Sequence, residues 1–257
     1  MNTIYVDNSA PEIMVLTPQD DDIVNSTFDI IVDITNTEFI DYLGYSLGGA
    51  WNEFDAATHI VISEVGYDQH GDYDVEFVEL YNPTSYTVDL SGYVLEDNSG
   101  VMVTIPAGTM LGPGEVFVIA DNQAEFEARF GFSADLYDPW PGLNDGGDFV
   151  DLMYAGVVID HVEWENGGAE GWSIASLDGG SIERVSARMD TDAENDWIAN
   201  TEPTPGVVED YYIATVDSMT YADGQYVVYV MGMDVIGHTT TVEVDIIIDN
   251  QDPVITL

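Results

Sequence analysis

One phrase occurs near both ends of this chain and limits how the chain can fold more than any other feature. Residues 6–13 and 248–255 share the pattern aliphatic-Asp-Asn-x-x-Pro-x-Ile. In tandem arrays, a recurring phrase of this kind marks the place where one module ends and the next begins. The chain is therefore predicted to span one repeat unit, with residues 1–8 and 251–257 as junctions to neighbouring modules of the same protein.

Between the two phrases, the sequence pattern is that of β-strands. Apolar and polar residues alternate over residues 27–34 and 226–231, and clusters of Gly, Asn, Asp and Pro bound these runs. The one helix that we expect covers residues 124–130, with Asp121 or Asn122 as its N-cap and Gly131 at its end. The sequence therefore predicts an all-β protein built from β-sandwiches.

The two outer segments resemble the opening and closing strands of bacterial and archaeal immunoglobulin-like surface repeats. The resemblance lies in residues 45–51 and in residues 223–226 followed by 233–238. Neither outer segment holds enough strands to close a sandwich, and the whole repeat is too long for a single sandwich of about 100 residues. We therefore expect residues 9–57 and 207–250 to form one discontinuous immunoglobulin-like domain.

The middle of the chain, residues 58–206, resembles a lamin-tail domain. The matching phrases follow the order of that family and lie at residues 62–65, 76–84, 88–97, 105–108, 111–115, 143–148, 158–164, 180–184 and 204–206. The resemblance implies a second immunoglobulin-like β-sandwich, inserted in a loop of the first. It implies nothing about nuclei or DNA, because this chain lacks the basic surface of the lamin version.

Three local patterns in the insert make further predictions. Glu76 and Glu79 alternate with apolar residues over residues 76–80, which predicts a strand with one solvent-facing side. Residues 144–147, Asn-Asp-Gly-Gly, predict a hairpin turn. Three tryptophans are expected to anchor the core or its rim: Trp164, Trp172 and Trp197.

The charge is extreme, with 49 Asp and Glu against three basic residues and a net charge of −46. The basic residues are Arg129, Arg184 and Arg188. Such a surface repels nucleic acid and anionic lipid, so neither nucleic acid nor direct membrane contact is expected. Two explanations of the charge stay open. High ambient salt would screen the repulsion over about 3 Å at 1 M, and bound Ca²⁺ would neutralise clustered carboxylates.

Two loops are candidate Ca²⁺ sites because carboxylates alternate along them. The candidate ligands are Asp68, His70, Asp72 and Asp74 in one loop and Asp190, Asp192 and Asp196 in the other. Neither loop has the glycine and glutamate positions of an EF-hand. In so acidic a chain, solvent-facing strand positions produce the same alternation, so both interpretations stay open. Ca²⁺ is the one cofactor that the sequence suggests.

Candidate catalytic groups are few. The chain has four histidines and no cysteine. His59 and His161 are expected in strands of the insert and His238 in a hairpin turn. No histidine stands beside a nucleophile motif, and the Gly-x-Ser-x-Gly, phosphate-loop and His-Glu-x-x-His patterns are absent. We predict that the chain is not an enzyme.

The composition and the resemblances together predict a structural or adhesive module of a multi-domain secreted or cell-surface protein. The acidic surface favours a salt-adapted microbe such as an archaeon as its source. Its expected partners are neighbouring immunoglobulin-like modules of the same chain, with other surface proteins or glycans as further candidates. The alternative is an accessory domain of a secreted hydrolase that binds carbohydrate or Ca²⁺. Flanking sequence would separate the two.

Overall fold

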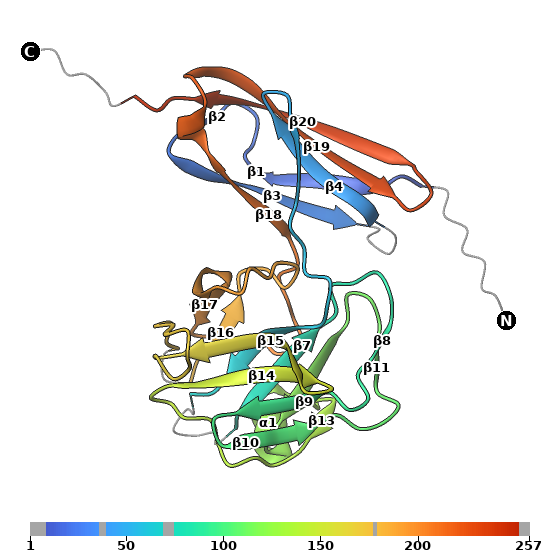
Figure 1. Ribbon diagram of the computed structural model, residues 1–257, viewed down its shortest axis with the longest axis vertical. Helices are drawn as coiled ribbons and strands as arrows, with labels where there is room; N and C mark the ends of the chain where they lie inside the picture. The colour runs from blue at the N-terminus through green and yellow to red at the C-terminus, as the bar shows by residue number, and fades with distance from the viewer. Residues whose placement is uncertain (1–8, 36–39, 69–74, 177–178, 252–257) are drawn as a thin grey trace, which may run out of the picture. The chain divides into compact units, whose positions relative to one another are not determined.

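The computed structural model describes residues 9–35, 40–68, 75–176 and 179–251. The chain divides into two compact units, and each is described separately. Unit 1 consists of Met1–Asp55 and Tyr211–Leu257, and unit 2 consists of Ala56–Asp210. The regular structure is mostly strand (Figure 1), so the all-β prediction is confirmed. The arrangement of two immunoglobulin-like domains and the predicted boundaries at residues 57/58 and 206/207 stay predictions.

Unit 1 contains two sheets. One has three strands in the order β1-β3-β18, and the other has five in the order β2-β20-β19-β4-β5. The strands are β1 (Glu12–Thr17), β2 (Asp22–Val24), β3 (Thr27–Thr35), β4 (Ile40–Leu47), β5 (Trp51–Glu53), β18 (Tyr212–Asp217), β19 (Gly224–Asp234) and β20 (Thr239–Ile248), with a 3-10 turn η2 (Ser218–Thr220) after β18. Strands from both ends of the chain, blue and orange in Figure 1, thus lie side by side in each sheet.

The core of unit 1 lies between its two sheets. Val32 of β3 and Val230 of β19 are both fully buried and belong to one apolar cluster. Alternate residues along β19 point into this cluster, while Tyr229 and Gln225 point away from it. Unit 1 is therefore a β-sandwich whose five-stranded sheet presents its other face outward.

Unit 2 contains a six-stranded sheet in the order β13-β12-β7-β6-β16-β17, a four-stranded sheet in the order β10-β9-β14-β15, and the pair β11-β8. Its elements are β6 (Val61–Gly66), β7 (Phe77–Tyr81), β8 (Val88–Asp89), β9 (Val94–Asp97), β10 (Gly100–Thr104), β11 (Met110–Leu111), β12 (Val116–Ala120), α1 (Gln123–Phe130), β13 (Leu136–Tyr137), β14 (Asp148–Tyr154), β15 (Val157–Trp164), β16 (Ser181–Arg184), η1 (Glu194–Asp196) and β17 (Trp197–Asn200).

The main core of unit 2 lies between the six-stranded and four-stranded sheets, and all three predicted tryptophan anchors are buried in it. Helix α1 covers part of the other face of the six-stranded sheet through Phe126, which packs against Phe77. The predicted caps are confirmed. The Asn122 side chain accepts a hydrogen bond from the Glu125 amide, and Gly131 ends the helix with φ of 78°. None of the helices in the described ranges is long and apolar enough to cross a membrane.

Two local predictions were wrong. Residues 144–147 form a turn, with the Gly147 amide donating to the Asn144 carbonyl, but they do not form a hairpin. The strands before and after this turn, β13 and β14, belong to different sheets. His59 lies ahead of β6 in a bend and not in a strand. The sequence signal correctly located the turn but carried no information about which strands it joins.

The expected solvent-facing side of β7 was also wrong. Glu76 and Glu79 are both fully buried. Because the two residues are three positions apart, their side chains point to opposite faces of the sheet, and both faces are covered. The Glu76 carboxylate accepts hydrogen bonds from the Trp140 indole at 2.6 Å and from the Leu143 amide. Burial of these acids is possible because each has hydrogen-bond donors close by.

Candidate functional site

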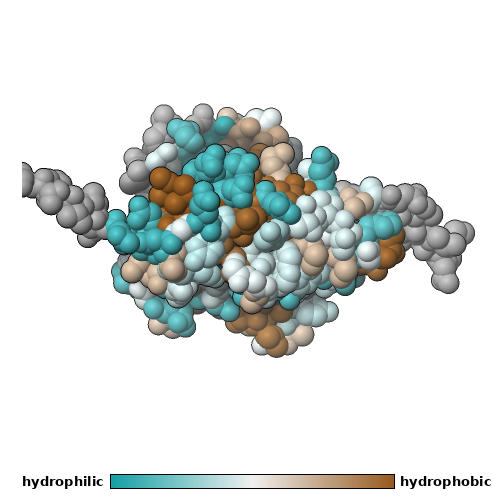
Figure 2. All heavy atoms as spheres, turned by 90° about the horizontal axis from the view of Figure 1, so that it is seen from above, coloured by the Kyte–Doolittle hydropathy of each residue, from teal (hydrophilic) through white to brown (hydrophobic). Residues whose placement is uncertain are grey.

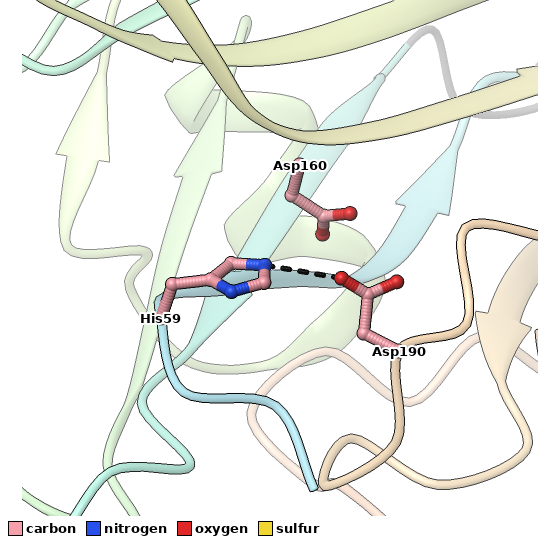
Figure 3. Close-up of side chains that lie close together, drawn as sticks. All are labelled: His59, Asp160 and Asp190. Atoms are coloured by element: carbon pink, nitrogen blue, oxygen red, sulfur yellow. Dashed lines mark ion pairs between the residues drawn. The ribbon is translucent and has the colours of Figure 1, made fainter. Parts of the chain in front are cut away.

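Three side chains of unit 2 with metal-ligand chemistry point toward one another (Figure 3). They are His59 ahead of β6, Asp160 in β15 and Asp190 in the loop after β16, and one ligand atom of each lies within 4.8 Å of the others. The His59 Nε2 atom lies 3.0 Å from Asp190 Oδ2. Within the part of the chain that the structure describes, this is the one group of three such residues.

A buried arginine contacts the two aspartates of this group. Arg184, the last residue of β16, is 2% exposed. Its Nη2 donates to Asp160 Oδ1 at 2.7 Å, its Nη1 donates to Asp190 Oδ1 at 3.3 Å, and its Nε donates to the Ile62 carbonyl at 2.7 Å. The guanidinium also lies 4.7 Å from the centre of the Trp197 ring. Arg184 therefore offsets part of the carboxylate charge from within the fold.

The Asp160 carboxylate joins the two main sheets of unit 2. It projects from β15 of the four-stranded sheet and binds Arg184 of the six-stranded sheet. Its second oxygen accepts a hydrogen bond from the Ile62 amide of β6 at 2.5 Å. Because both oxygens have donors, the cost of burying this charge is offset by directed hydrogen bonds.

Burial and the neighbouring charges shift the pKa values of the three residues in this cluster. Burial opposes ionisation of Asp190, but its contact with His59 and the charge of Arg184 outweigh burial and lower the pKa of Asp190 to about 2. The contact with Asp190 raises the pKa of His59. Burial raises the pKa of Asp160, and the adjacent guanidinium opposes that rise. The cluster is therefore an ion-pair network centred on a fixed cation.

A divalent cation fits this group poorly, although its donors are of a suitable type. Asp160 and Asp190 each already use an oxygen to bind Arg184. A metal ion placed among the same carboxylates would stand close to a guanidinium charge that is buried and cannot swing into solvent. The arrangement is suited to holding strands together and contains no hydroxyl or thiol nucleophile among the three residues in Figure 3.

Two of the predicted Ca²⁺ ligands, Asp190 and Asp196, lie beside the same guanidinium nitrogen of Arg184, at 3.3 Å and 3.6 Å. Asp190 binds Arg184 and His59, while Asp196 accepts hydrogen bonds from the Thr191 amide and hydroxyl, both at 2.7 Å. Asp192 is exposed in the same loop. Asp68 is half-buried beside residues 69–74. The other candidates, His70, Asp72 and Asp74, lie outside the described residues. Calcium binding at either loop stays a prediction.

A second cluster is a row of glutamates across three neighbouring strands, of which Glu64 and Glu79 are buried and Glu183 is partly exposed. Glu64 of β6 lies opposite Glu183 of β16 on one side and Glu79 of β7 on the other. Glu64 accepts hydrogen bonds from the Ser181 hydroxyl at 2.5 Å and from the Thr204 amide at 3.0 Å. Burial raises the pKa of Glu64 to about 8.

The neighbouring Glu79 holds the same chain segment. Its carboxylate accepts hydrogen bonds from the Ser63 hydroxyl at 2.7 Å and from the Gly206 amide. Burial raises the pKa of Glu79 to about 7. Glu64 and Glu79 together fasten residues 204–206 over the six-stranded sheet.

Sequence analysis gave Arg184 and Asp160 no role in a site. Their pairing links positions 24 residues apart that lie in different sheets, and no local motif reports it. One signal was present, because an acidic chain without lysine retains only three arginines. Arg184 and Arg188 are both buried, and Arg129 donates to the Gly179 carbonyl. All three therefore serve internal contacts of unit 2.

Comparison with known protein families gives a match, and it covers most of unit 2. Residues 54–166 match the family model of the lamin tail domain, which has an immunoglobulin-like fold. Residues 54–166 are thus similar to the lamin tail domain, whose family consists of non-catalytic modules. Such a domain suggests a structural or interaction role. No curated protein matches the sequence.

Proposed function

We propose that this chain is a structural and adhesive module of a secreted or cell-surface protein, located outside the cell. The observation that carries the proposal is the match to the lamin tail domain at residues 54–166, because that family consists of non-catalytic interaction modules. Beside it, unit 1 adds a second β-sandwich with an exposed sheet face. Two sandwiches in one chain suit a spacer that presents a binding surface.

The distribution of charge supports this proposal. Two buried polar clusters of unit 2 make hydrogen bonds within the unit. Arg184 binds its carboxylates, and Glu64 and Glu79 bind the backbone of residues 204–206. Groups held in this way brace the fold and do not face a substrate. A net charge of −46 keeps such a module soluble in high salt and away from other anionic polymers. We therefore include a salt-adapted source in the proposal.

Limited proteolysis of intact source cells tests the location. An antibody against the chain should detect fragments released by an added protease while the cell membrane stays closed. Sequencing the flanking coding region is the second arm, and further immunoglobulin-like modules with an anchor are expected there. A location inside the cell would overturn the proposal. A flanking catalytic domain would replace it with the alternative, an accessory domain of a secreted hydrolase.

A further inference from the structure

A groove of about 740 Å³ crosses the outward face of the five-stranded sheet in unit 1. Its centre is a row of three residues on neighbouring strands. Ser46 of β4 lies opposite Trp51 of β5 on one side and opposite Tyr229 of β19 on the other. Ser46 is small and only 4% exposed, so the floor of the groove is low between two large side chains.

The two aromatic side chains are exposed although each has a large apolar surface. Trp51 is 44% exposed and Tyr229 is 36% exposed. Because one strand separates their strands, their backbones are roughly 10 Å apart. Gly49, in the turn between β4 and β5, has φ of 129° and open space where a side chain would be, which leaves the groove accessible beside Trp51.

Polar groups with free hydrogen-bonding capacity surround these rings. The Trp51 indole N–H, the Tyr229 hydroxyl and the Gln225 amide make no side-chain hydrogen bond to any other described residue. The same holds for the carboxylates of Asp21 and Asp245, which also line the groove. The site therefore combines apolar ring faces with unused donors and acceptors.

The chemistry of this lining selects among ligand classes. No Lys or Arg lines the groove, so an anionic ligand would meet repulsion from Asp21 and Asp245 without any compensating cation. A purely apolar ligand would cover polar groups and leave them unpaired. The lining mixes apolar and polar residues, unlike the continuous apolar area of a typical obligate protein interface. Figure 2 shows one face of the molecule, on which apolar and polar residues are likewise interspersed.

We propose that this groove binds a neutral glycan chain, with sugar rings stacked on Trp51 and Tyr229. A pyranose ring has an apolar C–H face that packs on an aromatic ring and hydroxyls at its rim that bond to amide and carboxylate groups. Trp51 and Tyr229 lie on the strands either side of β4, and this spacing matches an extended chain of sugars. A small ammonium ion would instead need aromatic side chains close together around it. This inference rests on the adhesive role proposed above and names the class of ligand that the module would bind.

Titration calorimetry in 1 M NaCl with three neutral probes, cellohexaose, chitohexaose and mannohexaose, tests the proposal. At least one should bind the intact chain, and Trp51→Ala and Tyr229→Ala should each weaken binding about tenfold. Trp51→Phe should retain most of the affinity, since it keeps a ring. Tyr86→Ala is the matched control, because Tyr86 is an exposed aromatic residue of unit 2, and it should leave binding unchanged.

Binding of none of the three probes would overturn the proposal. So would binding that both alanine variants leave intact while circular dichroism shows them folded. Tighter binding of polygalacturonate than of the neutral probes would show that the groove takes an anion instead. Tighter binding of choline, lost in Trp51→Ala, would show that it takes a cation. Failure of all probes for a protein found on the cell surface would refute only the glycan site. A protein located inside the cell would refute the adhesive role whatever the titrations show.

Discussion

The two units use charge in opposite ways. Among the described residues, the interior of unit 1 holds one charged side chain, Asp234, while its core is otherwise apolar. Unit 2 buries many, and they are Glu64, Glu76, Glu79, Asp97, Asp148, Asp160, Glu163, Arg184, Arg188 and Asp196. All three arginines of the chain lie in unit 2. Unit 1 therefore places its charge in solvent, and unit 2 uses part of its charge as internal structure.

The contrast is most strongly tested by removing Arg184. Arg184→Met should destabilise unit 2 by about 3–5 kcal/mol, because it leaves Asp160 and Asp190 buried without their cation. Thermal unfolding followed by tryptophan fluorescence would measure this loss, since four of the five tryptophans lie in unit 2. The double variant Arg184→Met with Asp160→Leu should recover part of the loss.

Arg129→Met is the control for that experiment and should cost about 1 kcal/mol, since Arg129 is only partly buried. Unit 1 should unfold as before in every variant. Equal losses at Arg184 and Arg129 would refute the view that the ionic cluster supports unit 2.

The second test is the pH dependence of unit 2. The pKa of Glu64 is raised to about 8 and that of Glu79 to about 7, from a usual 4.5. Between these values the folded state binds more protons than the unfolded state, so stability falls as pH rises from 5 to 8. The slope is at most about 1.4 kcal/mol per pH unit for each group. His59, whose pKa is also raised, adds a loss of the same sign.

Glu64→Gln imitates the protonated acid and should flatten this slope, and chemical denaturation at pH 5, 6.5 and 8 would measure it. Glu170→Gln, at an exposed position of unit 2, is the matched control and should leave the slope unchanged. A variant as pH-sensitive as the parent chain would show that Glu64 is not the titrating group.

Added salt should stabilise unit 1 more than unit 2. Raising NaCl from 0.1 to 1 M shortens the screening length from about 10 Å to about 3 Å. Unit 1, with no arginine or lysine, should gain more than unit 2, whose ion pairs are buried and less screened. Each kcal/mol gained would raise the melting temperature of unit 1 by about 4–8 °C and that of the larger unit 2 by about 2–4 °C. Circular dichroism across the salt series measures both transitions, and a flat profile would refute the salt-adapted interpretation.

Separating the two units should change their stability least of all these experiments. Residues 56–210 expressed alone should fold and melt in 1 M NaCl within a few degrees of unit 2 in the intact chain. A chain in which a short Gly-Ser linker joins Asp55 to Tyr211 should also fold, because loop length contributes little free energy. A joined unit 1 that stays unfolded, while the intact chain is stable, would show that unit 1 depends on unit 2.

Local signals predicted local structure well. Asn122 and Gly131 specified the ends of α1 because capping depends on groups within one turn of the helix. The strand periods and the tryptophan anchors were also confirmed. The lamin-tail resemblance predicted for residues 58–206 is confirmed by the family match up to residue 166, and residues 167–206 lie outside that match.

Non-local contacts were not predicted. Glu79 has the position expected of a solvent-facing strand residue, and it is buried because residues 204–206 cover it from far along the chain. The partnership of Arg184 with Asp160 likewise needs the packing of one sheet on another. Periodicity reports which side a residue faces, but it does not report what covers that side.

The pairing of β3 with β18 has a consequence for how this protein is made. The partner strands Thr27–Thr35 and Tyr212–Asp217 leave the ribosome with all of unit 2 between them. At about 5–20 residues per second, β3 waits roughly 9–36 s for β18. During that time unit 2 is free to fold as a continuous segment, while the early strands of unit 1 keep apolar edges unpaired. The first 55 residues are therefore where nascent chains are most exposed to misassociation and chaperone capture.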